Sequence, residues 1–256
     1  NTDMASAPEN PTYDIVPAAD DAAVEHVYQH LKNFWFERHN IPIPDDEKED
    51  LFQQYQQTFY KPERVPLAAM LKDFCSSHGG DEEISFIEIG GANGTTLHYL
   101  KSFMDLDRVR YLGIEPFALF RDDFEQNFPD QKIIDGHVED FGVVDFSSLI
   151  PMPVTAVMCF GVLCMTPPRV ASAFLNIASE LTDDILGFDF CHNFEGTLPP
   201  DTQWLFKYDM DHGQIYFVHH FQKYLDGIGF EVVQKIPLPF ADGKIGWEVF
   251  HFRRRK

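Results

Sequence analysis

Residues 84–98 read ISFIEIGGANGTTLH, and this stretch decides the fold. It begins as a short apolar run of strand length that is rich in β-branched residues. Three glycines in five positions then interrupt the run, and apolar residues resume at helical spacing. The pattern predicts a strand, a tight glycine turn and the N-terminus of a helix. Glycine suits such a turn because it adopts positive φ and lets a ligand approach bare backbone.

The spacing of these glycines separates two kinds of nucleotide site. A dinucleotide fingerprint needs G-x-G-x-x-G, so that a pyrophosphate can sit on the helix N-terminus. Here the pattern is Glu88-x-Gly90-x-x-x-Gly94, with Gly91 beside Gly90. The carboxylate of Glu88 would repel a pyrophosphate and would suit a cationic group such as an amine. A glycine-rich turn that binds no ligand is the alternative.

A second apolar run, residues 110–114, ends in Glu115, which stands 21 residues after Gly94. A carboxylate at this position can accept hydrogen bonds from both hydroxyls of a ribose. The turn and the acid together therefore indicate a nucleoside site more strongly than either feature alone. Enzymes that use NAD share this acid, so it does not separate the cofactors.

From residue 84 onward, strand and helix patterns alternate, which is typical of a parallel sheet with right-handed crossovers. Residues 1–20 are polar and are expected to be mobile or to lie along the surface. We divide the chain into a helical extension, 1–80, and an α/β domain, 81–256. The sequence predicts helices at 20–38, 45–60 and 66–75, and strands at 84–89, 110–115, 132–134, 154–160, 184–191, 231–236 and 247–252.

These features resemble the class I S-adenosylmethionine-dependent methyltransferases over about residues 84–254. In that family an acid and a glycine turn close the first strand, and the seventh strand runs antiparallel. The resemblance implies an α/β fold with a Rossmann-like, seven-stranded, mostly parallel sheet that has helices on both faces. Here an N-terminal helical cap would be added. The implied cofactor is S-adenosyl-L-methionine, and the implied activity is methyl transfer.

The resemblance also assigns cofactor contacts to four segments. The glycine turn would touch the methionine and ribose portions, the segment after the third strand would touch adenine, and the end of the fourth strand would lie beside the methyl group. Either Glu139 or Asp140 would accept from the adenine amine, although a plain acidic loop is the alternative. The implied cofactor residues are Glu88, Gly90, Gly91, Ala92, Asn93, Gly94, Glu115, Pro116, Phe117, His137, Val138, Glu139, Cys159 and Phe160.

A histidine with a near-neutral pKa is the natural base for a hydroxyl acceptor. We rank His192 first because it follows Asp189 at the carboxyl end of the fifth predicted strand. The predicted catalytic residues are His192, His220 and Asp189, with His212 and His219 as further candidates. Asp189 could instead bind a metal with Asp209 or Asp211, as in catechol-type relatives. The acid expected after the fourth strand is missing, so no metal is predicted.

Aromatic residues are frequent in the helical extension and in the predicted loop 192–212. A long loop after the carboxyl end of a strand is where α/β folds place substrate contacts. We expect both segments to cover the acceptor, because aromatic walls suit an organic molecule. The rival view is that the first helices only pack on the sheet or form a homodimer contact. The candidate substrate residues are Tyr28, Trp35, Trp204 and Tyr208.

Composition narrows the partners of the 256-residue chain. Its net charge of −21 argues against a nucleic-acid partner, because phosphate contacts need clustered Lys and Arg. The four cysteines lack C-x-x-C spacing and indicate buried thiols of a reducing compartment. No apolar run reaches membrane-spanning length, and no signal peptide is visible. We therefore expect a cytoplasmic protein that binds neither nucleic acid nor membrane.

Three classes of function remain. The first is an S-adenosylmethionine-dependent methyltransferase that acts on a small organic acceptor, with transfer to oxygen predicted. The second is a nicotinamide-dependent oxidoreductase, which the missing G-x-G-x-x-G opposes. The third is a catalytically inactive cofactor-binding protein of the same fold. The segment Cys159-Phe160-Gly161 lacks the Asn/Asp-Pro-Pro-Phe/Tyr motif that the resemblance associates with enzymes acting on amines in nucleic acids, which opposes base methylation and leaves the acceptor undefined.

Overall fold

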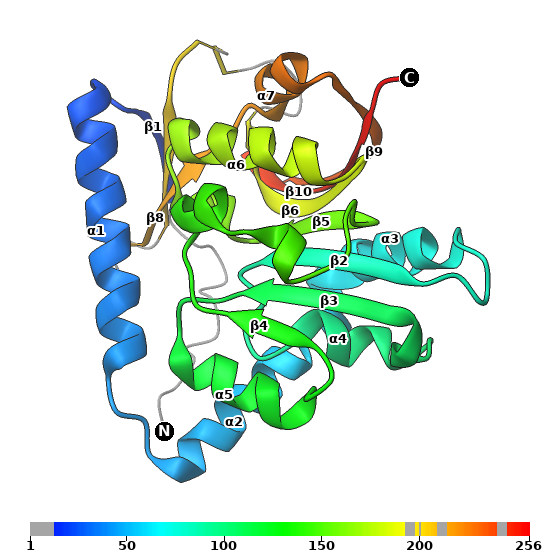
Figure 1. Ribbon diagram of the computed structural model, residues 1–256. Helices are drawn as coiled ribbons and strands as arrows, with labels where there is room; N and C mark the ends of the chain where they lie inside the picture. Colours follow the sequence, from blue (N-terminus) through cyan, green and yellow to red (C-terminus); the bar gives the residue numbers. More distant parts are fainter. Residues whose placement is uncertain (1–12, 193–197, 200, 209–213, 240–244) are drawn as a thin grey trace.

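The computed structural model describes residues 13–192, 198–199, 201–208, 214–239 and 245–256. The centre of this described part is a seven-stranded sheet with strand order β4-β3-β2-β5-β6-β10-β9 (Figure 1). The strands from β4 to β6 run parallel, whereas β10 runs antiparallel to both of its neighbours. The predicted seven-stranded, mostly parallel sheet is confirmed. Its strands are β2 (Ile84–Ile89), β3 (Val109–Ile114), β4 (Lys132–Ile134), β5 (Ala156–Phe160), β6 (Asp184–His192), β9 (Phe230–Pro239) and β10 (Ile245–Arg254).

Helices cover both faces of this sheet, as predicted. Packed on one face are α6 (Pro168–Leu181) and α7 (Phe221–Ile228). The other face packs against α3 (Val65–Ser76), α4 (Thr95–Leu100) and α5 (Ala118–Asn127). The result is a three-layer arrangement in which the sheet is buried between two helical layers (Figure 1).

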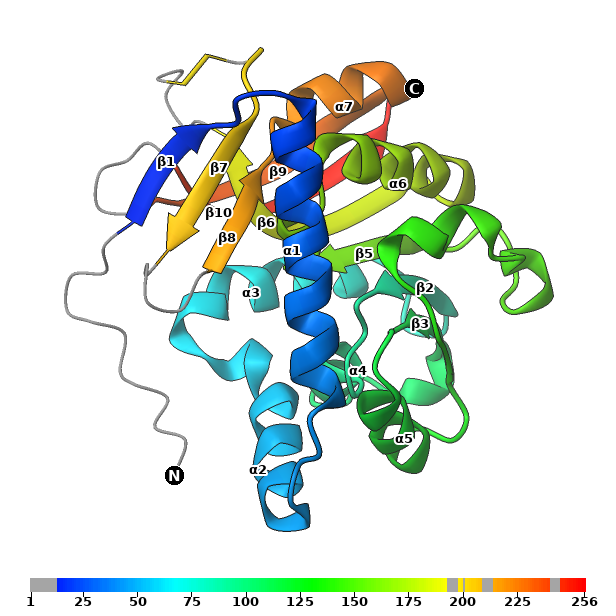
Figure 2. The same cartoon turned by 90° about the vertical axis from the view of Figure 1, so that its left-hand side faces the viewer.

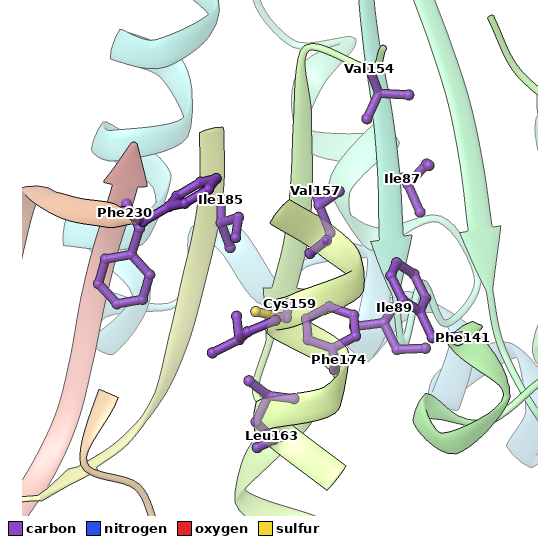
Figure 3. Close-up of a cluster of buried hydrophobic side chains, with 14 of the residues drawn as sticks. Ile87, Ile89, Phe141, Val154, Val157, Cys159, Leu163, Phe174, Ile185 and Phe230 are labelled. Atoms are coloured by element: carbon purple, nitrogen blue, oxygen red, sulfur yellow. The ribbon is translucent and has the colours of Figure 1, made fainter. Parts of the chain in front are cut away.

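The two apolar layers explain the sequence of β2. Successive side chains of a strand point to opposite faces. Ile87 and Ile89 pack in the cluster that contains Phe174 of α6 (Figure 3), whereas Ile84 and Phe86 pack in the cluster beneath α3. Burial on both faces is why this strand is apolar almost throughout rather than alternating.

Two helices, α1 and α2, precede α3 in the N-terminal part of the chain. The carboxylate of Asp20 caps α1 (Asp21–Asn40) by accepting from the Ala23 backbone N at 2.8 Å. The second helix, α2 (Asp45–Gln56), ends before the predicted residue 60, because the chain then tightens into the 3₁₀ turns Thr58–Tyr60 and Pro62–Arg64. Helix α1 is long enough to run from the upper part of the molecule down to α2 (Figure 2).

A second sheet was not predicted. Strands β1 (Tyr13–Pro17), β7 (Trp204–Tyr208) and β8 (Gln214–Val218) pair antiparallel in the order β1-β7-β8. Two sequence predictions are wrong in part: residues 13–17 are not a surface tail, and residues 204–208 are not loop. Each of these strands has five residues, and β1 and β7 are almost 200 positions apart, so local pattern gives little sign of their pairing.

This second sheet connects the N-terminal helices to the rest of the molecule. Leu205 and Phe217 pack against Tyr28 and Leu31 of α1. Helix α3 packs into the same core as β2. The division at residue 80 remains a prediction, and both sides of it share these cores. No helix in the described part of the chain is both long and apolar enough to cross a membrane.

Candidate cofactor and acceptor cavity

A cavity of about 570 Å³ lies at the carboxyl ends of β2, β3, β4 and β5. Helix α1 runs across this edge of the sheet (Figure 2), and its residues form one wall of the cavity. Helix α2 and the two 3₁₀ turns form another wall. Ligand sites of α/β sheets occupy this edge, and the volume is typical of a small-molecule site.

The glycine turn after β2 brings backbone to the cavity. Gly90 has φ 74°, and a Cβ there would lie 2.5 Å from Cγ2 of Val162. A Cβ on Gly91 would lie 2.6 Å from the Tyr111 hydroxyl oxygen. Ala92 also has a positive φ, 47°. Of the predicted turn residues, Gly90 and Ala92 border the cavity, whereas Gly91 does not.

The other two predicted turn residues have structural partners outside the cavity. Gly94 adopts φ 89° and is packed against the ring of Phe128. Asn93 is fully buried, and its amide donates to the Phe52 carbonyl at 3.1 Å and to Asp123 at 3.0 Å. Asn93 thereby ties the glycine turn to α2 and α5.

Glu88, at the end of β2, is a buried carboxylate that borders the cavity. Its Oε1 accepts from the Tyr111 hydroxyl at 2.5 Å, and its Oε2 accepts from the Thr96 hydroxyl at 2.8 Å. Burial raises the pKa of Glu88 to about 7, although both hydroxyls favour the charged form. A cationic group in the cavity would favour ionisation further.

Glu115 follows β3 and is held by backbone amides. Its Oε1 accepts from Ala92 N at 2.9 Å, and its Oε2 accepts from Phe117 N at 3.3 Å. Burial raises the pKa of Glu115 to about 7 as well. The carboxylate borders the cavity, and each carboxylate oxygen has lone pairs beyond the one that an amide occupies. The arrangement can accept two hydroxyl donors.

Aromatic rings and the segment after β4 form the far end of the cavity. Four of the predicted cofactor residues border it: Pro116, Phe117, His137 and Val138. The ring of His39, on α1, stacks on Phe117 with 3.4 Å between centroids. The sequence did not single out His39, because only the fold brings it to Phe117.

Both predicted adenine acceptors have other roles. Glu139 does not border the cavity; its Oε1 lies 3.9 Å from Lys32 and 3.9 Å from Arg169. Asp140 accepts from the backbone N of His137 at 2.8 Å, within the capping box of the 3₁₀ helix Val138–Val143. Neither acid lines the cavity, and their contact with adenine stays a prediction.

The end of β5 borders the middle of the cavity. Phe160 lines it, followed by Gly161, Val162 and, further on, Cys164. The side chain of Cys159 points the other way and is buried in the core below α6 (Figure 3). Strand alternation therefore separates the two predicted residues, and one of them faces the cavity.

Two of the three predicted catalytic residues, Asp189 and His220, do not line the cavity. Asp189 has no exposed surface, accepts from Phe190 N at 2.8 Å and does not line the cavity. His220 lines a separate cavity of about 80 Å³ with Cys191 and Glu248. The side chain of His192, at the end of β6, lies outside the described residues.

The further histidine candidates are accounted for differently. His219 is buried, and its Nε2 and Nδ1 contact the Leu163 carbonyl at 2.6 Å and the Tyr224 hydroxyl at 2.9 Å. Residues 209–213, which include His212 and the metal candidates Asp209 and Asp211, lie outside the described part. Within the described residues, no group of three or more His, Cys, Asp or Glu is placed to hold a metal ion.

Two of the four predicted substrate residues border the cavity. Tyr28 and Trp35 line it from α1. Trp204 belongs to the second sheet, where its Nε1 donates to the Pro199 carbonyl at 3.1 Å, and it does not line the cavity. The backbone of Tyr208 lies in β7, but its side chain is outside the described residues. Lining residues that the sequence did not reveal are Phe59, Arg64, Tyr216 and Trp247.

Solved methyltransferase structures share this fold. The 1,6-didemethyltoxoflavin-N1-methyltransferase from Burkholderia thailandensis has a TM-score of 0.57 and 14% identity, over 96% of this chain and 100% of that chain. The CurJ carbon methyltransferase has a TM-score of 0.54 and 16% identity, over 82% of this chain. A methyltransferase from Clostridium acetobutylicum ATCC 824 has a TM-score of 0.52 and 7% identity, over 81% of this chain and 99% of that chain. The chain spans 59% of the CurJ chain.

No protein-family model matches the chain, and no curated protein matches it either. The solved structures nevertheless establish the fold: this chain has the Rossmann-like fold of S-adenosylmethionine-dependent methyltransferases. The sequence resemblance predicted that fold from the glycine turn and Glu115, and the fold is confirmed. Because one fold hosts many chemistries, the activity has to be argued from the cavity.

Proposed function

We propose that this protein is an S-adenosyl-L-methionine-dependent methyltransferase that acts on a small organic acceptor, with transfer to oxygen. The observation that carries the proposal is the pair of buried carboxylates, Glu88 and Glu115, that border one cavity beside a glycine turn. Both are held by hydrogen-bond donors within the protein. In the proposal they serve as partners for the amine and the ribose hydroxyls of the cofactor.

The residues present fit the cofactor group by group. Glu115 would accept from the ribose hydroxyls, Glu88 would lie near the methionine amine, and the adenine would lie by Phe117 and Val138. Gly90 borders the cavity, and its backbone, which carries no Cβ, would allow close approach. The cofactor supplies an electrophilic methyl group on a sulfonium.

Positioning is the main contribution that the protein can make to such a transfer. An in-line displacement needs the acceptor atom held at near-attack distance from the methyl carbon. The end of β5, with Phe160 and Gly161, borders the cavity between its two halves. Helix α1 forms one wall of the cavity and would help to exclude water from the reacting atoms. For a hydroxyl acceptor, His192 remains the proposed base, because β6 lies beside β5 and continues past the end of β5 to His192.

The cavity also supports a small acceptor rather than a nucleic acid. It is a hollow lined by aromatic rings, and its volume is in the range of small-molecule sites. The N1-methyltransferase from Burkholderia thailandensis that shares the fold is named for 1,6-didemethyltoxoflavin, which is a small organic molecule. At 14% identity that likeness supports the plausibility of the acceptor class and nothing finer.

A labelling experiment tests the proposal. The protein is incubated with methyl-labelled S-adenosylmethionine and a panel of small phenols, and label in the organic products is counted. Acceptor-dependent transfer that is lost in Glu115→Ala is the expected result. Binding of NAD with no binding of S-adenosylmethionine would contradict the proposal and favour the nicotinamide alternative.

A further inference from the structure

Positive side chains are concentrated in the cavity of a chain whose net charge is −21. Among the described residues that line it, the acids are Glu88 and Glu115, both at the proposed cofactor half. The cations outnumber them and come from the N-terminal part of the chain. They are Lys32, Arg38, Lys61 and Arg64.

Arg64 is the cation whose surroundings are most specific. It ends the 3₁₀ turn Pro62–Arg64 and is half-buried. Its guanidinium carbon lies 4.1 Å from the centroid of the Phe188 ring and 5.7 Å from that of Trp247. Such ring contacts stabilise a guanidinium and fix the direction in which its plane faces.

No described acid forms an ion pair with this guanidinium. Glu63 and Asp189 act on it only at longer range, and burial outweighs them, so the pKa of Arg64 is lowered. A half-buried guanidinium has lost part of its hydration, and an ion pair with a carboxylate would normally offset that free-energy cost. The position therefore suits an anion that arrives with a ligand.

The sheet order places Arg64 on the acceptor side of the cavity. Phe188 lies on β6 directly beside Phe160 of β5, and Trp247 lies on β10, one strand further. Glu88 and Glu115 lie at the ends of β2 and β3, on the other side of β5. The end of β5 thus separates Arg64 from the half that the cofactor would occupy.

The walls near Arg64 suit a flat, apolar body. Phe59 and Phe160 border the cavity, and their rings pack against each other at 5.8 Å between centroids. Trp247 borders it too and is stacked on Phe188 at 4.6 Å. Rings held in this way present fixed apolar faces to a planar molecule.

We propose that the acceptor is a planar organic acid whose carboxylate is bound by Arg64. A guanidinium can bind a carboxylate through two parallel hydrogen bonds, which fixes orientation as well as affinity. This inference rests on the proposed function, because that function assigns the β5–β10 half of the cavity to the acceptor. The rival role for Arg64 is to hold the carboxylate of the cofactor.

The test uses matched probes that differ in charge and not in shape: 4-hydroxybenzoate and 4-hydroxybenzamide. Each is titrated calorimetrically into protein saturated with S-adenosylhomocysteine at pH 7.5. Wild-type protein is expected to bind the acid at least about tenfold more tightly than the amide. In Arg64→Gln the two probes should bind equally, while the Kd of S-adenosylhomocysteine stays unchanged.

Two further variants separate charge from shape and from folding. Arg110→Gln removes the same charge from a surface pair with Glu83, remote from the cavity, and should behave as wild type. Arg64→Lys keeps the charge but not the planar fork and should retain part of the preference. It also keeps the test decisive if Arg64→Gln fails to fold.

Equal affinity of wild type for the two probes, or no detectable binding of either, would overturn this inference. So would an unchanged preference in Arg64→Gln. Weaker S-adenosylhomocysteine binding in Arg64→Gln, with the preference unchanged, would assign Arg64 to the cofactor instead. If wild-type protein does not bind S-adenosylhomocysteine at all, the proposed function itself is wrong, which distinguishes the two failures.

Discussion

At the scale of single residues, Glu115 gives the sharpest expectation. Its carboxylate is fixed by the amides of Ala92 and Phe117 and borders the cavity. Two charge-assisted bonds to a ribose are worth roughly 1.5–3 kcal/mol when lost. Glu115→Ala should therefore weaken S-adenosylhomocysteine binding by about one to two orders of magnitude, measured by calorimetry.

A matched control comes from the surface. Glu83→Ala removes a carboxylate that pairs with Arg110 at 3.0 Å and is half-exposed, so the cofactor affinity should not change. Circular dichroism shows whether both variants keep the fold. Unchanged affinity in Glu115→Ala would place the ribose elsewhere.

Asp189 gives an expectation for pH. Burial raises its pKa from 3.8 to about 8 in the native state. The folded protein therefore binds a proton more tightly than the unfolded chain, so this group favours folding at low pH. That stabilisation is lost as pH rises from about 4 towards 8.

The uncharged variant Asp189→Asn isolates this effect from the other acids. Between pH 5 and pH 8, wild type should lose about 1.4 kcal/mol or more of unfolding free energy relative to the variant, which is the value of one pKa unit. Urea unfolding at the two pH values measures the difference. An equal pH dependence in both proteins would show that Asp189 is not shifted.

At the scale of elements, α1 forms one wall of the cavity, and we propose that it covers the bound ligand. It contributes Tyr28, Trp35 and His39 to the lining, and Glu25 on its outer side pairs with Arg169 of α6 at 2.5 Å and 2.9 Å. That pair is exposed and contributes little to stability. Helix α1 is therefore held mainly by apolar and aromatic side-chain contacts, and a ligand in the cavity would add further contacts to it.

Hydrogen exchange tests whether α1 is a cover. Saturation with S-adenosylhomocysteine should slow exchange of the amides around residues 32–40, because a ligand beneath the helix lowers the frequency of local opening. Exchange in β9 (Phe230–Pro239), which does not border the cavity, is the internal control. If the amides of α1 exchange more slowly at higher protein concentration, and not when ligand is added, the rival homodimer contact would be favoured.

The three-stranded sheet β1-β7-β8 supports α1. Its residues Leu205 and Phe217 pack against α1, so the N-terminal half of that helix is held by the second sheet. The sequence of residues 1–20 and 192–212 did not predict this sheet, because five-residue strands with partners far away in sequence carry weak local signals. Only the tertiary structure reveals the pairing.

At the scale of the whole molecule, the sequence predicted the central sheet and the glycine turn but not the cavity residues that other elements position. The seven strands follow from apolar runs buried on both faces, and the glycine turn and Glu115 follow from spacing. His39 and Arg64 were missed because their roles depend on rings of Phe117 and Phe188 that come from other elements. A contact between residues far apart in the sequence does not change the local hydrophobic periodicity, so the sequence pattern does not reveal it.

The central claim is that this cavity binds S-adenosylmethionine, and one titration tests it most directly. S-adenosylhomocysteine and NAD are each titrated into wild-type protein in a calorimeter under identical conditions. We expect saturable binding of S-adenosylhomocysteine at one site, weaker by about one to two orders of magnitude in Glu115→Ala, and no binding of NAD. Saturable binding of NAD without binding of S-adenosylhomocysteine would contradict it.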